Sequence, residues 1–573
     1  MHLELTDSRR LTGPNLYWEL PSAIIDVEIG GSPDAVIRAW QAAAKQWLDR
    51  LGYADEKTCF RIYDGGASLL ISAPIDVLYS MCELNELAWA SALSACGAGE
   101  APNPEEEIPR LTRQFDEERN PPLLALQSAA NEKGVPFLWD DDEVSLGYGK
   151  TARIWKPDML PSPAELDWDS FSAIPVALVT GTNGKSTTVR MTASIMMAAG
   201  YNAGLTSTDF IRVGKRMIDS GDYSGTGGAR MLMRQPDVDM AVLEVARGGL
   251  LRRGLGVEHA DVAVVTNVAA DHLGEYGINS VSELIPAKFI VRRALDKNAP
   301  LVLNADDEGV VAFAGQLDNR IVWFSLDPEN PHLKKSLANG GAACWLDQGW
   351  LVAADGNNHR RIVLVEQIPS TRAGIVRYNV RNALAAVCIA IALGIDQAAI
   401  CKGLEDFQGD EVDNPGRGNW FEHKLGDGIV QILVDFAHNE HGMQALAETI
   451  NQVDSERVIL LMGQAGDRLD EDIAALVLAA CSVGPDRLLV AELPGYERGR
   501  KPFEVAELIR QEALRAGIAA DAIEILPGPQ EATALALRLA QPGDLLVLLA
   551  LTQRAEALSL VHDYIGSGEG GHG

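Results

Sequence analysis

The segment that most constrains the fold is residues 176–190, VALVTGTNGKSTTVR, in which an apolar run breaks into glycines, hydroxyl residues and a lysine. The run Val176 to Val179 suits a buried strand, and Val189 to Met197 show helical spacing until Gly200. Between a strand and a helix, glycines let backbone N–H groups turn toward a polyphosphate, the lysine meets its terminal phosphates, and a serine hydroxyl can bind Mg²⁺. We therefore expect an ATP-binding loop formed by Gly181, Thr182, Asn183, Gly184, Lys185, Ser186 and Thr187.

The length and composition narrow the class of protein. A chain of 573 residues suggests three or four domains. It has no apolar run long enough for a membrane span, its start lacks the apolar core of a secretory signal, and its seven cysteines are scattered without CxxC spacing. These features predict a cytoplasmic protein with free thiols. The net charge of −31 disfavours nucleic acid and anionic membranes, so an acidic substrate would need local basic clusters.

The chain is expected to divide into three domains. Residues 1–165 carry no phosphate motif and include a helical stretch near 75–94, an acidic segment that is either a loop or a charged helix, and a linker at 157–170. In 172–410 and again in 411–565, apolar strand candidates alternate with helical stretches, which predicts α/β domains with parallel sheets. The tail 566–573 has a flexible composition. The expected strands are 176–179, 240–245, 262–265, 301–303, 321–324, 432–434, 458–462, 488–490 and 545–549.

Polar residues follow the strand candidates after the loop. Glu244 ends one strand, where open α/β sheets place ligand residues and a carboxylate can hold Mg²⁺, although a surface salt bridge is the alternative. Thr266 ends another strand, and His272 follows it beside an aspartate, which favours a functional histidine. Lys288 falls on a predicted helix and is either a site residue or an exposed lysine in a salt bridge.

These motifs together resemble the central domain of the Mur ligase family, which includes peptidoglycan amino-acid ligases and folylpolyglutamate synthase. The loop TGTNGKST departs from the general Walker A spacing at Val179 and is similar to the ATP loop of that family. TNVAADHLG and the later motifs LNADD, YNVRNALAA, NPGRGN, VDFAHN and GQAGDR follow in the family's order over about 400 residues. The resemblance implies a P-loop ATPase domain with a parallel sheet and a smaller Rossmann-like C-terminal domain, preceded here by an α+β domain.

The resemblance also implies roles for individual residues. Lys185, His272 and Lys288 match catalytic positions, with Lys288 matching a lysine that many members carry as a carbamate. The implied metal ligands are Ser186, Glu244 and His272, and the implied nucleotide contacts outside the loop are Asn304, Asn382, Arg417 and Asp435. Tentative contacts for an acidic substrate are Arg247, Arg252, Arg253 and His438, with Arg498, Arg500 and Lys501 as a second set, although both arginine clusters are also explained as solvated surface.

Within the family, the run ending in ARGGLLRRGLG is similar to cyanophycin synthetases, as is the N-terminal LTGPNLYWELPSAIIDVEIG. In those enzymes a segment like VSLGYGKTARIW, residues 144–155, leads into an ATP-grasp domain that builds a polyaspartate backbone. Here it leads through a short linker into the phosphate loop, so we expect no ATP-grasp domain between them. The helix around Glu83 also lacks the histidines of those enzymes, which leaves polymer handling by this domain open.

The resemblance implies an ATP- and Mg²⁺-dependent ligase. ATP would phosphorylate a carboxylate, of an aspartyl substrate, and an amine such as arginine or lysine would attack the acyl phosphate to form an amide. Folylpolyglutamate-like ligation is one alternative, and a non-catalytic paralogue that binds nucleotide or an acidic polymer and regulates a partner is another. The expected partners are small molecules or short peptides, and self-association stays open.

Overall fold

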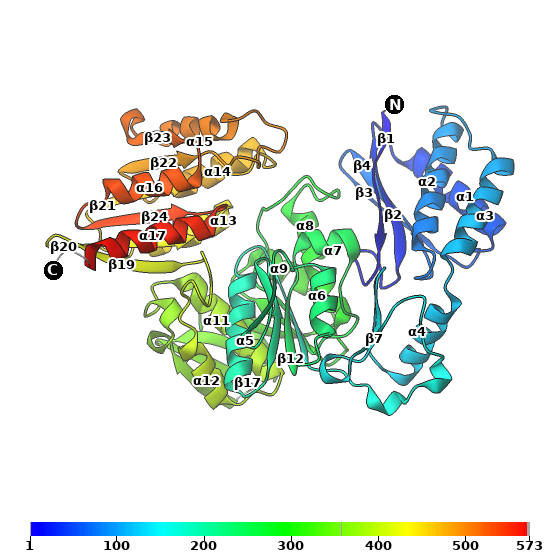
Figure 1. Ribbon diagram of the computed structural model, residues 1–573, viewed down its shortest axis with the longest axis horizontal. Helices are drawn as coiled ribbons and strands as arrows, with labels where there is room; N and C mark the ends of the chain where they lie inside the picture. The colour runs from blue at the N-terminus through cyan, green and yellow to red at the C-terminus, as the bar shows by residue number, and fades with distance from the viewer. Residues whose placement is uncertain (1, 357, 570–573) are drawn as a thin grey trace.

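The computed structural model describes residues 2–356 and 358–569, and within them the strands form four sheets. Figure 1 shows the middle of the chain in green, with the N-terminal region in blue and the C-terminal region in orange and red on opposite sides of it. The last helix continues to Glu569, through part of the segment expected as a tail, and residues 570–573 lie outside the described part. Among the described helices, none is long and apolar enough to cross a membrane.

The N-terminal region is built on an antiparallel sheet with strand order β1-β2-β4-β3. Helix α2 packs on this sheet and α1 packs on α2, so that Trp40 and Met81 are buried between them. The acidic segment forms a helix, α3, whose first turn is capped by the Asn103 side chain. The elements are β1 (Leu3–Leu11), β2 (Ser22–Ile29), α1 (Asp34–Leu51), β3 (Thr58–Tyr63), β4 (Gly66–Ser72), α2 (Leu78–Ala95), α3 (Pro104–Glu118), α4 (Pro121–Lys133), β5 (Phe137–Trp139), β6 (Val144–Leu146) and β7 (Arg153–Trp155).

The middle region is a sheet with strand order β11-β10-β9-β12-β8-β13-β14-β15-β16-β17-β18, covered by helices on both faces. The strands from β9 to β16 in this order are parallel, as predicted, whereas both edges are antiparallel. The elements are β8 (Val176–Thr180), α5 (Lys185–Ala198), β9 (Ala203–Thr206), β10 (Phe210–Val213), β11 (Arg216–Ser220), α6 (Thr226–Met233), β12 (Met240–Glu244), α7 (Arg247–Arg253), β13 (Val262–Val265), α8 (Val281–Lys288), β14 (Pro300–Asn304), α9 (Glu308–Ala314), β15 (Arg320–Ser325), α10 (Pro331–Ala338), β16 (Ala342–Asp347), β17 (Trp350–Asp355), β18 (Asn358–Leu364), α11 (Arg377–Ala392) and α12 (Gln397–Asp406).

Strand order explains why the predicted site residues meet. Strand β8 lies between β12 and β13, and all three run parallel. Their carboxyl ends carry the phosphate loop, Glu244 and Thr266, which therefore open onto the same edge of the sheet. All residues of β8, β12 and β13 are buried, because helices cover both faces of this part of the sheet.

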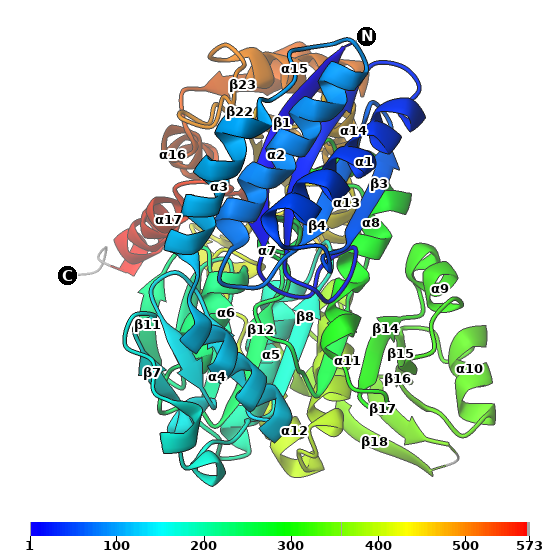
Figure 2. The ribbon, with the colours of Figure 1, turned by 90° about the vertical axis from the view of Figure 1, so that its right-hand side faces the viewer.

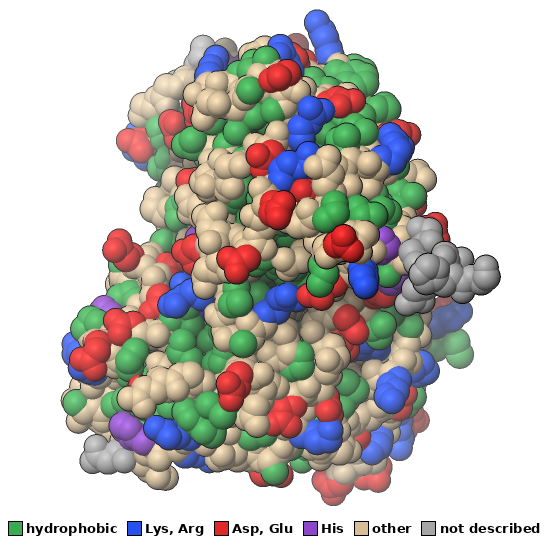
Figure 3. Space-filling model, turned by 90° about the vertical axis from the view of Figure 1, so that its left-hand side faces the viewer, with side chains coloured by type: hydrophobic (Ala, Val, Ile, Leu, Met, Phe, Trp, Pro, Cys, Tyr) green, Lys and Arg blue, Asp and Glu red, His purple; other side chains and the backbone are tan. Residues whose placement is uncertain are grey.

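The C-terminal region is a second α/β unit with strand order β19-β20-β24-β21-β22-β23, parallel except for the β19–β20 hairpin. It lies against the carboxyl edge of the middle sheet, where Asn183 contacts Asn439. Figure 3 shows acidic and basic side chains scattered over the outer surface on one side of the molecule. The elements are β19 (Asn419–Leu425), β20 (Gly428–Asp435), α13 (Glu440–Ile450), β21 (Arg457–Met462), α14 (Asp470–Cys481), β22 (Arg487–Ala491), α15 (Glu504–Arg515), β23 (Ile523–Leu526), α16 (Pro529–Leu539), β24 (Asp544–Leu549) and α17 (Arg554–Glu569).

Candidate active site

The phosphate loop is held in place by the end of the neighbouring strand. Thr182 N donates to the Asn267 carbonyl at 2.9 Å, and Asn183 N donates to the Asn267 side chain at 2.9 Å. Gly184 has φ +86°, and a Cβ there would lie 2.3 Å from Asn382 Oδ1, so the loop needs glycine at this position. The TN pair that follows β13 is thus a scaffold for the loop.

A corner lined by two hydroxyl groups and a carboxylate lies beside the loop. Ser186 Oγ is 3.2 Å from Thr208 Oγ1, and Glu244 Oε2 accepts from Thr208 N at 3.3 Å. Glu244 is only 2% exposed, so it is not the surface salt-bridge residue of the alternative interpretation. Within the described residues its Oε1 atom has no hydrogen-bond partner. A buried carboxylate oxygen without a partner beside two hydroxyls is a donor set that fits a hard divalent cation such as Mg²⁺.

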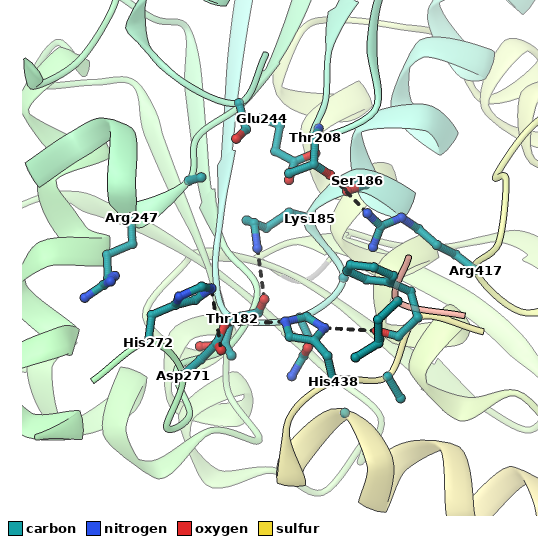
Figure 4. A pocket seen from close by; sticks show the side chains of 18 of the residues that line it. Thr182, Lys185, Ser186, Thr208, Glu244, Arg247, Asp271, His272, Arg417 and His438 are labelled. Atoms are coloured by element: carbon teal, nitrogen blue, oxygen red, sulfur yellow. Dashed lines mark hydrogen bonds and ion pairs between the residues drawn. The ribbon is translucent and has the colours of Figure 1, made fainter. Parts of the chain in front are cut away.

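Two lysines converge on the loop. Lys185 Nζ donates to Thr182 O at 2.9 Å, as Figure 4 shows at the centre of the site. Lys288, the last residue of α8, is 4% exposed and its Nζ donates to Gly181 O at 2.8 Å. Burial, together with the nearby charge of Lys185, holds the pKa of Lys288 well below its usual value. Lys288 is therefore a buried site residue and not an exposed helix lysine.

His272 belongs to a second cluster. Its Nε2 lies 3.0 Å from Arg468 Nη2, and Arg468 also forms an ion pair with Asp271 at 3.1 Å. Although 43% of its side chain is exposed, partial desolvation in the cleft and the charges of Arg468 and Arg247 lower the pKa of His272, so the ring is neutral at physiological pH. In Figure 4, His272 lies on the other side of Lys185 from Glu244 and Ser186. The three expected metal ligands thus do not share one contact point in this arrangement.

Sequence reasoning missed a carboxylate surrounded by arginines. Asp209, just after β9, forms ion pairs with Arg190, with Arg554 at 2.9 Å and with Arg417 at 3.4 Å. Arg417 and Arg554 come from the C-terminal region, and both guanidinium groups stack over the Phe436 ring. Although burial acts the other way, the arginines hold the pKa of Asp209 below its usual range. The only sequence signal was an aspartate after a buried strand.

The remaining expected residues divide between the cleft and the structure around it. Asn382, Asp435, His438, Arg247 and Arg252 line the cleft together with the loop.

Three residues expected at the site, Asn304, Arg253 and Arg500, are not among those that line the cleft. Asn304 is buried and donates to Thr266 O at 2.9 Å, so it supports the strand end. Arg253 donates to Arg10 O at 3.2 Å and turns toward the N-terminal region. In the second arginine set, Arg498 lines the cleft, whereas Arg500 pairs with Asp470 at 2.7 Å inside the C-terminal region.

The cleft between the middle and C-terminal regions has a volume of about 890 Å³. The two regions touch across it, because Asn183 of the loop donates to Asn439 Oδ1 at 3.0 Å and lies 3.0 Å from His441 Nδ1. Fold and site thus define a class of protein in which a phosphate-loop α/β domain is closed by a second α/β domain.

The chain belongs to the Mur ligase family. Residues 179–390 match the Mur ligase middle domain, and residues 416–550 match the Mur ligase glutamate ligase domain.

Among its relatives, the cyanophycin synthetase of Crocosphaera subtropica is 36% identical over 405 residues, which covers 71% of this chain and 45% of the relative. That of Synechocystis sp. is 37% identical over 338 residues, covering 59% of this chain and 38% of the relative. The UDP-N-acetylmuramoyl-L-alanyl-D-glutamate–2,6-diaminopimelate ligase of Geobacter metallireducens is 27% identical over 398 residues, covering 65% and 73%. The chain spans less than half the length of these cyanophycin synthetases. E. coli FolC in complex with DHPP and ADP aligns at 20% identity and a TM-score of 0.49, covering 68% of this chain and 89% of FolC, too low a similarity to bear on function.

Proposed function

We propose that this chain is an ATP-dependent ligase that joins a carboxylate to an amine. The observation that carries the proposal is the buried Glu244 carboxylate, which has an unpartnered oxygen beside the phosphate loop and Ser186. Family membership supports it, because the two matched domains are those that flank the cleft.

In the proposed reaction a carboxylate oxygen of the acid attacks the γ-phosphorus of ATP and ADP leaves. The amine nitrogen then attacks the acyl carbon, the bond to phosphate breaks, and the amine loses a proton. Both steps concentrate negative charge, so fixed cations are the main source of catalysis.

Residues of this chain would bind the phosphates, the metal ion and the nucleoside. Loop N–H groups and Lys185 would bind the phosphates, and Arg417 would offset charge from the C-terminal region. Ser186 and Glu244 would hold Mg²⁺, which when bound neutralises phosphate charge. Asp435 and Asn382 line the cleft toward the expected nucleoside. Lys288, as a carbamate, would be an anion behind the loop; its low pKa favours the neutral amine that carbamate formation requires.

Two arginines of α7, Arg247 and Arg252, form one side of the cleft, which we call the acid-binding wall. Arg247 is 6% exposed, and its Nη1 has no hydrogen-bond partner among the described residues. Its other nitrogen pairs with Glu275, which is half exposed and could yield to a substrate carboxylate. Arg247 and Arg252 both line the cleft. Because a buried guanidinium needs an anionic partner, we propose that these arginines bind the acid, as a small molecule, a short peptide or an acidic polymer.

The resemblance seen in the sequence suggests the substrates to test first. The motifs shared with cyanophycin synthetases favour an aspartyl acid and arginine, and folylpolyglutamate-like ligation is the alternative. A non-catalytic paralogue is disfavoured, because Lys185, Ser186 and Glu244 are all present at the cleft.

The test is a screen for ADP release. Aspartate, aspartyl peptides and reduced pterin acids would each be combined with arginine, lysine or glutamate, ATP and Mg²⁺, and products would be identified by mass spectrometry. We expect ADP release that needs both acid and amine, with an amide product. Nucleotide binding without acid-dependent ADP release in any combination would support the non-catalytic paralogue instead.

A further inference from the structure

The helix that carries the cleft arginines is capped by the N-terminal region. Helix α7 has only seven residues, too few to be stable alone. Its final carbonyls need donors. Arg9 Nε donates to Leu251 O at 3.0 Å, and Thr12 N donates to Arg253 O at 2.8 Å. The end of β1 and the residue that follows it therefore supply donors to the last turn of α7, and Figure 1 and Figure 2 show α7 beside the end of this strand.

Arg9 is a rigid donor. The residue is 8% exposed, and its Nη1 donates to Asp26 Oδ2 at 2.5 Å. Asp26 is fixed in turn, because Ser68 Oγ donates to its other oxygen at 2.6 Å. Arg9 thus connects Asp26 of the N-terminal sheet to the backbone of α7. If α7 moved away from β1, the buried charge of Arg9 would become exposed.

The N-terminal region also holds the loop at 271–279, which brings Asp271, His272 and Glu275 to the cleft. Arg61 Nη2 donates to Tyr276 O at 3.0 Å. Gly277 approaches Tyr63 so closely that a Cβ would lie 2.3 Å from its ring.

Tyr276 links the two contacts. The Arg9 guanidinium lies 4.6 Å from the centre of the Tyr276 ring, and Arg252 Nε donates to the Tyr276 hydroxyl at 3.3 Å. One tyrosine therefore touches the N-terminal region with its ring and backbone, and a cleft arginine with its hydroxyl.

We propose that the N-terminal region positions the acid-binding wall of the cleft. Arg9, Arg61 and Tyr63 are positioning residues that act through α7 and the 271–279 loop on Arg247 and Arg252. A change in this contact would alter recognition of the acid and leave the phosphate loop and Glu244, which belong to other elements, unaffected. The placement of the wall follows from the structure, whereas its effect on acid recognition rests on the proposed function.

The test uses the full chain with Arg61→Met and Tyr63→Leu. Lys150→Met is the matched control, because Lys150 joins the N-terminal region to Asp239 at 2.6 Å, at the end of β12 that faces away from the cleft. Amide hydrogen exchange is measured without substrates. We expect faster exchange at 247–253 and 271–280 in both test variants, with the C-terminal strands unchanged, and no change at these segments in the control. Unchanged exchange at both segments, or faster exchange throughout the molecule, would overturn the proposal.

Steady-state kinetics supply a second readout. With the acid that supports ADP release, we expect the KM for the acid to rise about three- to tenfold in the test variants, because each loses one hydrogen bond or contact. The KM for ATP should stay constant. Equal changes in both KM values would contradict positioning of the acid wall. If no acid supports ADP release, the proposed function fails, and hydrogen exchange still decides whether the N-terminal region holds these segments.

Discussion

At the scale of single residues, Lys185 is the most direct probe of the nucleotide site. Lys185→Ala removes the ammonium group that lies on the phosphate loop, so we expect acid-dependent ADP release to fall by at least about a hundredfold. Circular dichroism should match the wild type, because the side chain lines the cleft. The exposed Lys297→Ala is the control. Turnover near the wild-type rate would rule out the assignment of Lys185 to the phosphates.

Lys288 offers a test of carbamate formation. Because burial keeps its pKa low, the neutral amine can take up CO₂, and we expect ligation to depend on bicarbonate. Lys288→Ala should lose several orders of magnitude in rate, and small carboxylic acids should restore part of it. Normal ligation by the variant, or a wild type without bicarbonate dependence and without carbamate mass, would show that Lys288 acts only as an amine that supports Gly181.

Asp435 predicts a pH dependence of stability. Burial raises its pKa to about 6 from 3.8, so the folded protein favours the protonated acid. Its contribution to stability is complete below pH 3.8 and is lost as pH rises through 6. Between pH 3.8 and 6, the wild type should therefore lose about 2–3 kcal/mol more unfolding free energy than Asp435→Asn, as measured by urea denaturation at each pH. Asp427→Asn, in the exposed hairpin turn, is the control. An unchanged slope in Asp435→Asn would contradict the raised pKa.

At the scale of elements, the loop between β8 and α5 depends on one glycine. Gly184→Ala combines a positive φ of +86° with a Cβ placed 2.3 Å from Asn382, so it should displace the loop. Gly200→Ala is a matched control, because its φ is +89° but no atom lies within 4 Å of the added Cβ. We expect both variants to lose about 1–2 kcal/mol of stability and only Gly184→Ala to lose ADP binding by calorimetry. Equal binding by both would show that the Asn382 contact is not needed.

The elements that sequence predicted best are those with long buried runs. The strand at 176–179 and the helix after it were expected, because a continuous apolar run and a clear stop at Gly200 leave few alternatives. The antiparallel edges were not expected. Strands β17 and β18 carry little periodic signal, because 351–354 are all buried and 358–361 are all exposed, so neither strand alternates.

Within the site, residues at or just after the ends of predicted strands were predictable, and partners contributed by distant elements were not. Lys185, Ser186 and Glu244 follow strand ends, so a local pattern finds them. The Arg554–Asp209 ion pair joins residues 345 positions apart, and nothing near either residue announces the other. Arg253 shows the opposite error, because its helix lies at the cleft while its side chain bonds to the N-terminal region.

At the scale of the whole molecule, the short connection between β7 and β8 limits the chemistry. Strand β7 ends at Trp155 and strand β8 begins at Val176, which leaves no room for an ATP-grasp domain between them. We expect this chain to consume one ATP per amide and not to extend a polyaspartate backbone. Mass spectrometry of a reaction with aspartate, arginine and ATP tests this, and products of increasing backbone length would contradict it. The domain limits near 165–172 and 410 stay predictions.

The arginines around Asp209 bear on how the cleft can open. Arg417 and Arg554 would leave with the C-terminal region, whereas Arg190 belongs to the same region as Asp209 and is itself fully buried. If the two regions separated, Asp209 would lose the ion pairs with Arg417 and Arg554 but keep the one with Arg190. The Asp209 carboxylate would therefore not be left buried without a counter-charge. Opening of the cleft would therefore cost less than the exposure of an unpaired buried charge, and Arg417 and Arg554 would remain stacked on Phe436 of their own region.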